Sequence, residues 1–115
     1  MEKQPLNADR FNLKFVGLED TKLKPEQKEQ LKELVKLETQ KIEREIPHNF
    51  DVIIHIKEYE KQSKKQRYAL ILKIESPGQV YTSEHSQKDA WDIKAAVRSA
   101  FDNIKIEIMK KRRTN

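Results

Sequence analysis

Three runs of strand-like sequence are the strongest indication of the architecture: VIIHIKEY at Val52–Tyr59, RYALILKIE at Arg67–Glu75 and VYTSEH at Val80–His85. Much of the first two runs alternates between an inward apolar set and a second set, the period of a strand with one buried face. The third run is the most polar, so we expect it at a sheet edge. The polar segment 60–66 predicts a hairpin loop, and Ser76-Pro77-Gly78 predicts a turn. The three runs therefore predict an antiparallel meander.

One amphipathic helix is predicted on each side of the meander. Lys24-Pro25-Glu26 marks the start of the first, with proline at the first helical position, and Pro47 stops it after Ile46. Its apolar stripe consists of Leu31, Leu34, Val35, Ile42 and Ile46. Ser86-Gln87-Lys88-Asp89 resembles a capping box and starts the second helix, which ends in the basic run 109–113. The stripe of this helix consists of Ile93, Val97, Ala100, Phe101, Ile104 and Ile108.

The run Phe11–Phe15 alternates like a further strand, which Gly17 ends. The complete order is β-α-β-β-β-α. It predicts an α+β fold: a four-stranded, mainly antiparallel sheet with both helices packed on one face. Residues 10–113 form a single domain in this prediction, and residues 1–9 are a flexible arm. The other face of the sheet is expected to be open and polar, with His55, Lys57 and Lys73 on it.

Composition limits the classes of function. The 115 residues carry 24 Lys and Arg against 19 Asp and Glu, and the surplus of five favours a polyanionic partner. The absence of cysteine excludes disulfides, thiolate catalysis and zinc-cysteine sites. No secretory signal is recognised at the start, and no apolar run approaches the ~20 residues of a membrane span. We therefore expect a cytoplasmic protein without a membrane partner.

No catalytic constellation is recognisable. His48, His55 and His85 are isolated from one another, and with only Gly17 and Gly78 the chain has no phosphate-binding glycine loop. We expect no enzymatic activity, no cofactor, no metal and no small-molecule substrate.

Basic residues are the remaining candidates, and they fall on the two predicted helices. In the first helix they recur every fourth residue, which is consistent either with a solvated face paired to Glu29 and Glu33 or with binding of a polyanion. In the second they form one face and the terminal run. The candidate RNA-binding residues are Lys24, Lys28, Lys32, Lys36, Lys94, Arg98, Lys105, Lys110, Lys111, Arg112 and Arg113.

Several short motifs follow in an order that resembles the ribosome hibernation-promoting factor family, which includes the ribosome-associated inhibitors. They are Gly78-Gln79-Val80-Tyr81-Thr82-Ser83, Asp89-Ala90-Trp91, Ala96-Val97, Phe101-Asp102-Asn103-Ile104 and Glu107-Ile108. The resemblance spans about residues 10–113 and is to the short form of the family. The chain departs from the family motif at Arg98, where an acid is usual, and at Asn103 and Ile106, where cations are usual.

The resemblance implies binding to rRNA of the small ribosomal subunit, in the channel used by mRNA and tRNA. Such binding would block translation and preserve idle ribosomes under stress, and it implies a monomer away from the ribosome. Two alternatives stay open. One is a double-stranded RNA-binding domain, whose core has the same α-β-β-β-α order. The other is a protein–protein interaction module that uses the open sheet face.

Overall fold

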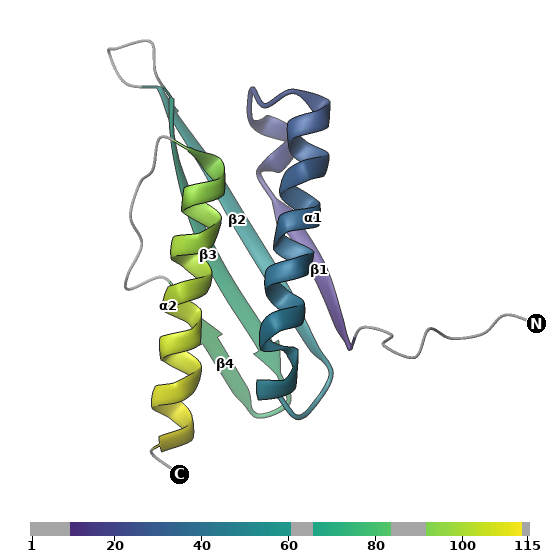
Figure 1. Cartoon of the computed structure of the whole chain (residues 1–115), viewed down its shortest axis with the longest axis vertical. Helices are drawn as coiled ribbons and strands as arrows, with labels where there is room; N and C mark the ends of the chain where they lie inside the picture. Colours follow the sequence, from purple (N-terminus) through teal and green to yellow (C-terminus); the bar gives the residue numbers. More distant parts are fainter. Residues whose placement is uncertain (1–9, 61–65, 84–91, 114–115) are drawn as a thin grey trace, which may run out of the picture.

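The computed structural model describes residues 10–60, 66–83 and 92–113, which form an α+β fold (Figure 1). This confirms the predicted class and the order of the elements. The strands are β1 (Phe11–Val16), β2 (Phe50–Glu60), β3 (Gln66–Ser76) and β4 (Gln79–Thr82), the helices are α1 (Pro25–Ile42) and α2 (Ile93–Arg113), and two short 3-10 turns are η1 (Leu18–Asp20) and η2 (Glu43–Glu45).

The four strands pair in chain order, β1-β2-β3-β4. The pair β1–β2 is parallel, with Phe11 opposite Phe50, whereas β2–β3 and β3–β4 are antiparallel. The parallel pair follows from α1, because a helix between two strands carries the chain back to the end of the sheet from which it started. The sheet is therefore mixed, with two of its three pairings antiparallel.

Both helices cover the same face of the sheet and run side by side in the same direction (Figure 1). The strand register explains which residues they bury. Val52, Ile54 and Ile56 pair with Ile74, Leu72 and Leu70, and the side chains of all six are at most 4% exposed. The alternate residues, including His55, Lys57 and Lys73, lie on the opposite face, as the alternation predicts.

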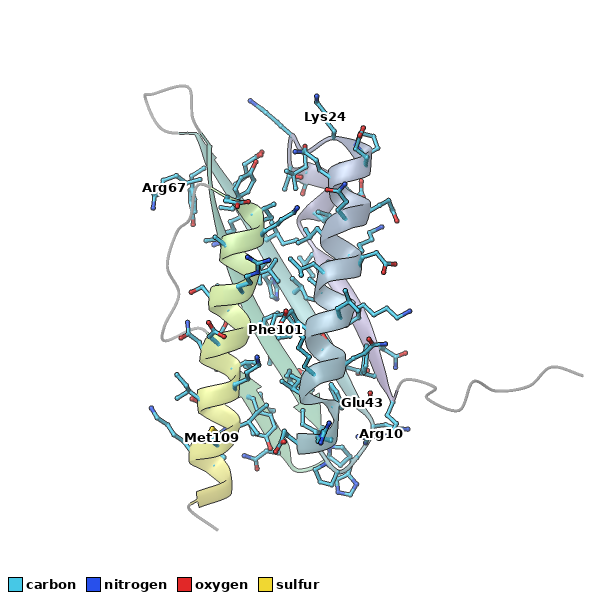
Figure 2. All side chains as sticks on the ribbon, viewed as in Figure 1. Arg10, Lys24, Glu43, Arg67, Phe101 and Met109 are labelled. Atoms are coloured by element: carbon cyan, nitrogen blue, oxygen red, sulfur yellow. The ribbon has the colours of Figure 1, made fainter. Side chains whose placement is uncertain are left out.

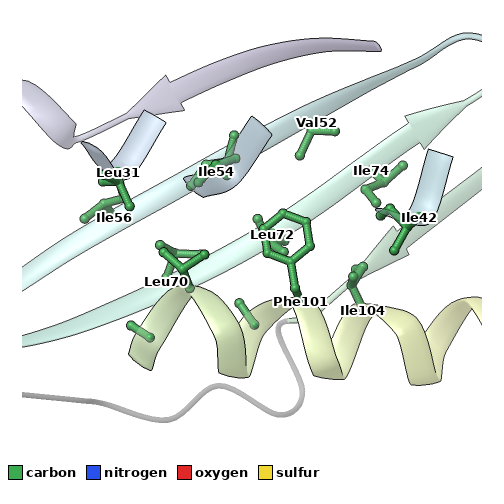
Figure 3. Packing of buried hydrophobic residues seen from close by; sticks show 14 of the residues in the cluster. Leu31, Ile42, Val52, Ile54, Ile56, Leu70, Leu72, Ile74, Phe101 and Ile104 are labelled. Atoms are coloured by element: carbon green, nitrogen blue, oxygen red, sulfur yellow. The ribbon is translucent and has the colours of Figure 1, made fainter. Parts of the chain in front are cut away.

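The core lies between the sheet and the helix pair. Figure 3 shows the ring of Phe101 pointing from α2 toward Leu72 in the middle of the sheet, with Ile104 one turn along α2. Phe101, Leu72 and Ile104 are fully buried. Both predicted stripes contribute to this cluster, with only Leu34 and Ile93 partly exposed at its margin. Burying a side chain such as leucine or phenylalanine contributes about 1.5–3 kcal/mol, so this layer supplies much of the folding free energy.

The first helix ends earlier than the sequence suggests. Its α-helical part stops at Ile42, η2 follows, and Ile46 has extended dihedrals (φ −117°, ψ 113°). Pro47 accounts for this, since the residue before a proline disfavours helical dihedrals. Arg10 stabilises the end of the helix, because its guanidinium donates hydrogen bonds to the carbonyl oxygens of Glu43 (2.7 Å) and His48 (3.0 Å) (Figure 2).

The edge strand β4 is shorter than predicted and ends at Thr82. Ser83 then closes the end of the pairing, because its backbone N–H donates to the Leu72 carbonyl at 3.0 Å and its Oγ accepts from the Leu72 N–H at 2.9 Å. Five predicted features lie partly or wholly outside the described residues: the arm 1–9, most of the hairpin loop 60–66, Glu84 and His85 of the third run, the capping box 86–89 and the Asp89-Ala90-Trp91 motif.

Gly17 ends β1, as predicted, and the structure gives the reason. Its φ is +89°, a region that L side chains rarely adopt, and a Cβ there would overlap the carbonyl oxygen of Ile56. Glycine thus lets the chain leave β1 in close contact with β2.

Candidate nucleic-acid interface

The positive charge of the chain is concentrated on one element, α2. Its 21 residues include seven Lys or Arg and two acids, Asp102 and Glu107. That surplus of five equals the surplus of the whole chain, so the remaining 94 residues carry equal numbers of basic and acidic side chains. Local surplus charge of this kind creates a field that attracts polyanions. The structure therefore points to α2 as the basic surface.

Lys94 and Arg98 lie on the flank of α2 that faces α1. Both side chains are exposed. They line one side of a shallow groove of about 370 Å³, and its remaining lining residues come from α1: Glu29, Gln30, Glu33, Leu34 and Leu37. Two cations of α2 thus face two carboxylates of α1 across apolar side chains.

Lys105 lies further along the same flank, where a carboxylate from α1 reaches it. Glu38 is almost buried, and its side chain lies 3.0 Å from the Nζ of Lys41 and 4.0 Å from the Nζ of Lys105. A second groove of about 410 Å³ follows, lined by Lys41, Ile42, Glu45, Lys105, Ile108 and Met109. The charge of Lys105 is consequently partly balanced within the chain.

The sequence does not single out Glu38, although its position contains a signal. It lies three residues after the buried Val35 and four before the buried Ile42, so it falls on the apolar side of α1. A carboxylate on such a face needs a cationic partner, and Lys41 and Lys105 supply one from each helix.

The four candidate lysines at the start of α1 and along it line neither groove: Lys24, Lys28, Lys32 and Lys36. The Nζ of Lys28 lies 3.2 Å from Glu19 of η1, and that of Lys32 lies 3.5 Å from Glu29. Lys36 is exposed, and Lys24 precedes α1 at the end opposite Met109 (Figure 2). The structure thus divides the candidate residues into two sets on different elements, of which the α1 set is partly paired with acids.

The basic end of α2 is also divided. Lys110 is exposed, whereas Lys111 turns toward the sheet edge. Its Nζ lies 5.4 Å from the centre of the Tyr81 ring and donates a hydrogen bond to the carbonyl oxygen of Val80. Arg112 and Arg113 belong to the helix, but their side chains lie outside the described residues. Lys111 therefore has a structural role at β4.

Other kinds of site have little support in the described part of the chain. Residues 10–60, 66–83 and 92–113 contain no group of three His, Asp or Glu side chains placed to hold a metal ion. Over the same residues, no helix has the length and the apolar character that crossing a membrane requires.

The open face of the sheet carries apolar residues as well as the expected polar ones. Ile53 and Ile71 are half-buried there, beside His55, and Val80 is exposed at the edge. β-Branched residues suit a half-buried pleated surface, which accounts for their presence. The face is thus less polar than predicted.

Comparison with known proteins adds no relative: no family model matches the chain, and no curated protein matches it significantly. The family resemblance in the short motifs stays a prediction.

Proposed function

We propose that the chain binds rRNA of the small ribosomal subunit through the exposed flank of α2 and thereby silences translation in idle ribosomes. The observation that supports this proposal is the concentration of the surplus charge on α2, with Lys94, Arg98 and Lys110 exposed on it. Lys and Arg that neutralise phosphates release counterions, which makes such binding strong at low salt and weak at high salt. A helix surface of this kind recognises the shape and the backbone of RNA.

The β-α-β-β-β-α order is what the resemblance implies, and it gives α2 a rigid support. Phe101, Ile104 and Ile108 fix the helix on the sheet from its buried side, which leaves the cationic flank exposed in a constant orientation. A rigid set of cations loses less conformational entropy on binding than the same charges on a mobile tail.

Co-sedimentation of the full chain with purified small subunits at increasing salt tests the proposal. The charge reversal Lys94→Glu with Arg98→Glu should weaken binding about 10- to 100-fold and reduce the salt dependence. The matched control is Lys14→Glu with Lys57→Glu, which makes the same change in net charge at exposed positions of the sheet's open face. The control should bind nearly as well as the unmodified chain.

An equal loss of affinity in both double variants would contradict a role for α2 in particular. Binding that does not change with salt concentration would contradict its electrostatic basis. An in vitro translation assay adds the functional readout, since the unmodified chain should lower protein synthesis and the α2 variant should not. Tight binding to naked RNA duplexes of any sequence, without preference for the subunit, would favour the duplex-RNA alternative.

A further inference from the structure

The outer surface of the helix pair exposes large apolar side chains. Leu37 of α1 and Met109 of α2 are each 53% exposed, and Ile106 of α2 is 52% exposed. They are the three most exposed large apolar residues of the described chain. Leu37 and Met109 line the two grooves along the seam between α1 and α2. The outer surface of the helix pair is therefore partly apolar along the seam.

Charges on the two sides of the seam are opposite in sign. Glu33 from α1 and Arg98 from α2 line the same groove and are both exposed. Within the described residues, neither side chain has an ion pair within 4.0 Å. The surface thus presents an available anion on one helix beside an available cation on the other. A surface of this kind is complementary to a copy of itself.

We propose that this surface is the contact of a symmetric homodimer, in which the helix pair of one copy packs against that of a second. A twofold axis parallel to the seam would place α2 of each copy on α1 of the other. A rotation about an axis parallel to the helices (Figure 1) leaves the position of each residue along them unchanged, so residues that share a groove stay at the same level. Arg98 of each copy would then meet Glu33 of the other, with Leu37 close to the axis.

Charge selects this axis over the alternative one. A twofold axis across the helices would place α2 against α2, each with its surplus of five positive charges. Like charges at close range in an interface are strongly unfavourable. In contrast, the segment from α1 to η2 has six acids and five basic residues, so it can accept α2 of a second copy. The self-complementary contact is the isologous interface of ordinary C2 dimers.

The size of the surface predicts a weak dimer. At 1.5 Å per residue the helices are about 27–32 Å long, and a pair about 20 Å wide covers roughly 550 Å² per copy. The total of roughly 1,100 Å² is at the lower end of specific interfaces, so we expect a dissociation constant of about 10–100 µM. The family resemblance implied a monomer. That expectation did not include this surface, because the exposure of Leu37 follows only from the packing of the helices.

A trans-complementation experiment tests the dimer by sedimentation equilibrium between about 1 µM and about 1 mM. Glu33→Lys alone and Arg98→Glu alone each create two repulsive contacts in the homodimer and should weaken it at least about tenfold. A mixture of the two variants should form heterodimers as tight as the unmodified dimer. In the heterodimer the introduced lysine of one variant meets the introduced glutamate of the other, and the second contact is native. Lys14→Glu, on the opposite face, is the matched control and should not alter the dimer.

A chain that stays monomeric to about 1 mM would overturn the proposal. A mixture of the two variants that does not form dimers as tight as the unmodified dimer would also overturn it. Leu37→Ala should also weaken the dimer, and circular dichroism of each variant verifies its fold. The dimer does not depend on the proposed function, and Glu33→Lys separates the two. It should weaken self-association at least about tenfold while leaving ribosome binding intact or stronger, since it adds a cation.

Discussion

Arg10 and Glu43 hold the beginning of β1 against the end of the first helical segment. The backbone N–H of Arg10 donates to a carboxylate oxygen of Glu43 at 2.9 Å, and the Arg10 guanidinium donates to the Glu43 carbonyl at 2.7 Å (Figure 2). The two residues are 33 positions apart in sequence. The Glu43 carbonyl also accepts the backbone N–H of Ile46 at 3.2 Å, so the guanidinium is a second donor to the carbonyl that closes η2.

Replacing Arg10 by alanine should lower the free energy of unfolding by about 2 kcal/mol, because hydrogen bonds from a charged donor contribute more than neutral ones. Arg10→Lys should recover only part of the loss, since lysine cannot reach two carbonyls with one planar group. Chemical denaturation measures both. Lys14→Ala, at an exposed position of β1, should change stability by less than about 0.5 kcal/mol. A similar loss in both alanine variants would contradict the role of Arg10.

The two glycines provide a matched pair for the turn that follows β1. Both have positive φ, +89° at Gly17 and +77° at Gly78, but only at Gly17 would a Cβ meet another atom within 4 Å. Gly78→Ala should cost about 1 kcal/mol, the penalty of the dihedral alone. Gly17→Ala should cost at least about 2–3 kcal/mol, because the backbone of β2 must also move. Thermal unfolding distinguishes them, and equal losses would contradict the steric contact with Ile56.

The titration of Tyr68 should make the stability of the fold depend on pH in the alkaline range. Burial raises the pKa of Tyr68 above its ordinary value of 10.0, and the negative charge of Glu58, its cross-strand partner, raises the pKa further. The folded state therefore keeps the phenolic proton at a pH where the unfolded chain releases it. The contribution of Tyr68 to the free energy of unfolding is complete below pH 10. It declines as the pH rises from 10 toward the pKa of Tyr68 in the folded state.

Denaturation curves across this pH range should show that the free energy of unfolding declines less in Tyr68→Phe than in the unmodified chain. Glu58→Gln should also reduce it, because removal of the negative charge lowers the pKa of Tyr68. Identical pH profiles for all three proteins would contradict the assignment.

Lys110 and Lys111 are adjacent basic residues with different expected effects. Lys111→Ala should lower stability by about 0.5–1 kcal/mol, because it removes the contact with Tyr81 and the hydrogen bond to Val80. Lys110→Ala, at an exposed position, should leave stability unchanged and reduce ribosome binding under the proposed function. Chemical denaturation and co-sedimentation of the same samples measure both effects. If Lys110→Ala lowered stability and Lys111→Ala did not, the side chain of Lys111 would not be held at β4.

Glu38→Gln tests whether Glu38 limits binding by Lys105. Removing its charge frees Lys41 and Lys105 from their carboxylate, so ribosome affinity should rise a few-fold and become more salt-dependent. The stability change should be small, because the neutral glutamine leaves no buried charge unpaired and the two lysines keep access to water. Weaker binding of this variant would contradict a contribution of Lys105 to the interface.

Sequence periodicity was sufficient to predict the elements and their buried faces. Residues alternating with period two in β2 and β3, and the stripes of both helices, are the residues that the structure buries. Burial follows from this local pattern because apolar surface must leave water wherever the chain folds. The predicted end of α1 was less accurate. Pro47 affects the dihedrals of the residue before it, and the 3-10 turn η2 replaces the last helical turn.

Local sequence patterns were thus enough to predict the α+β class, the order of the elements and the sign of the charge. The position of each cation depends on tertiary packing: Lys28 lies beside Glu19, Lys105 near Glu38, Lys111 on β4, and Arg98 across a groove from Glu33. Helical spacing fixes which residues share a side of one helix. It does not fix which element that side meets, because the packing of the helices on the sheet brings together residues that are distant in sequence.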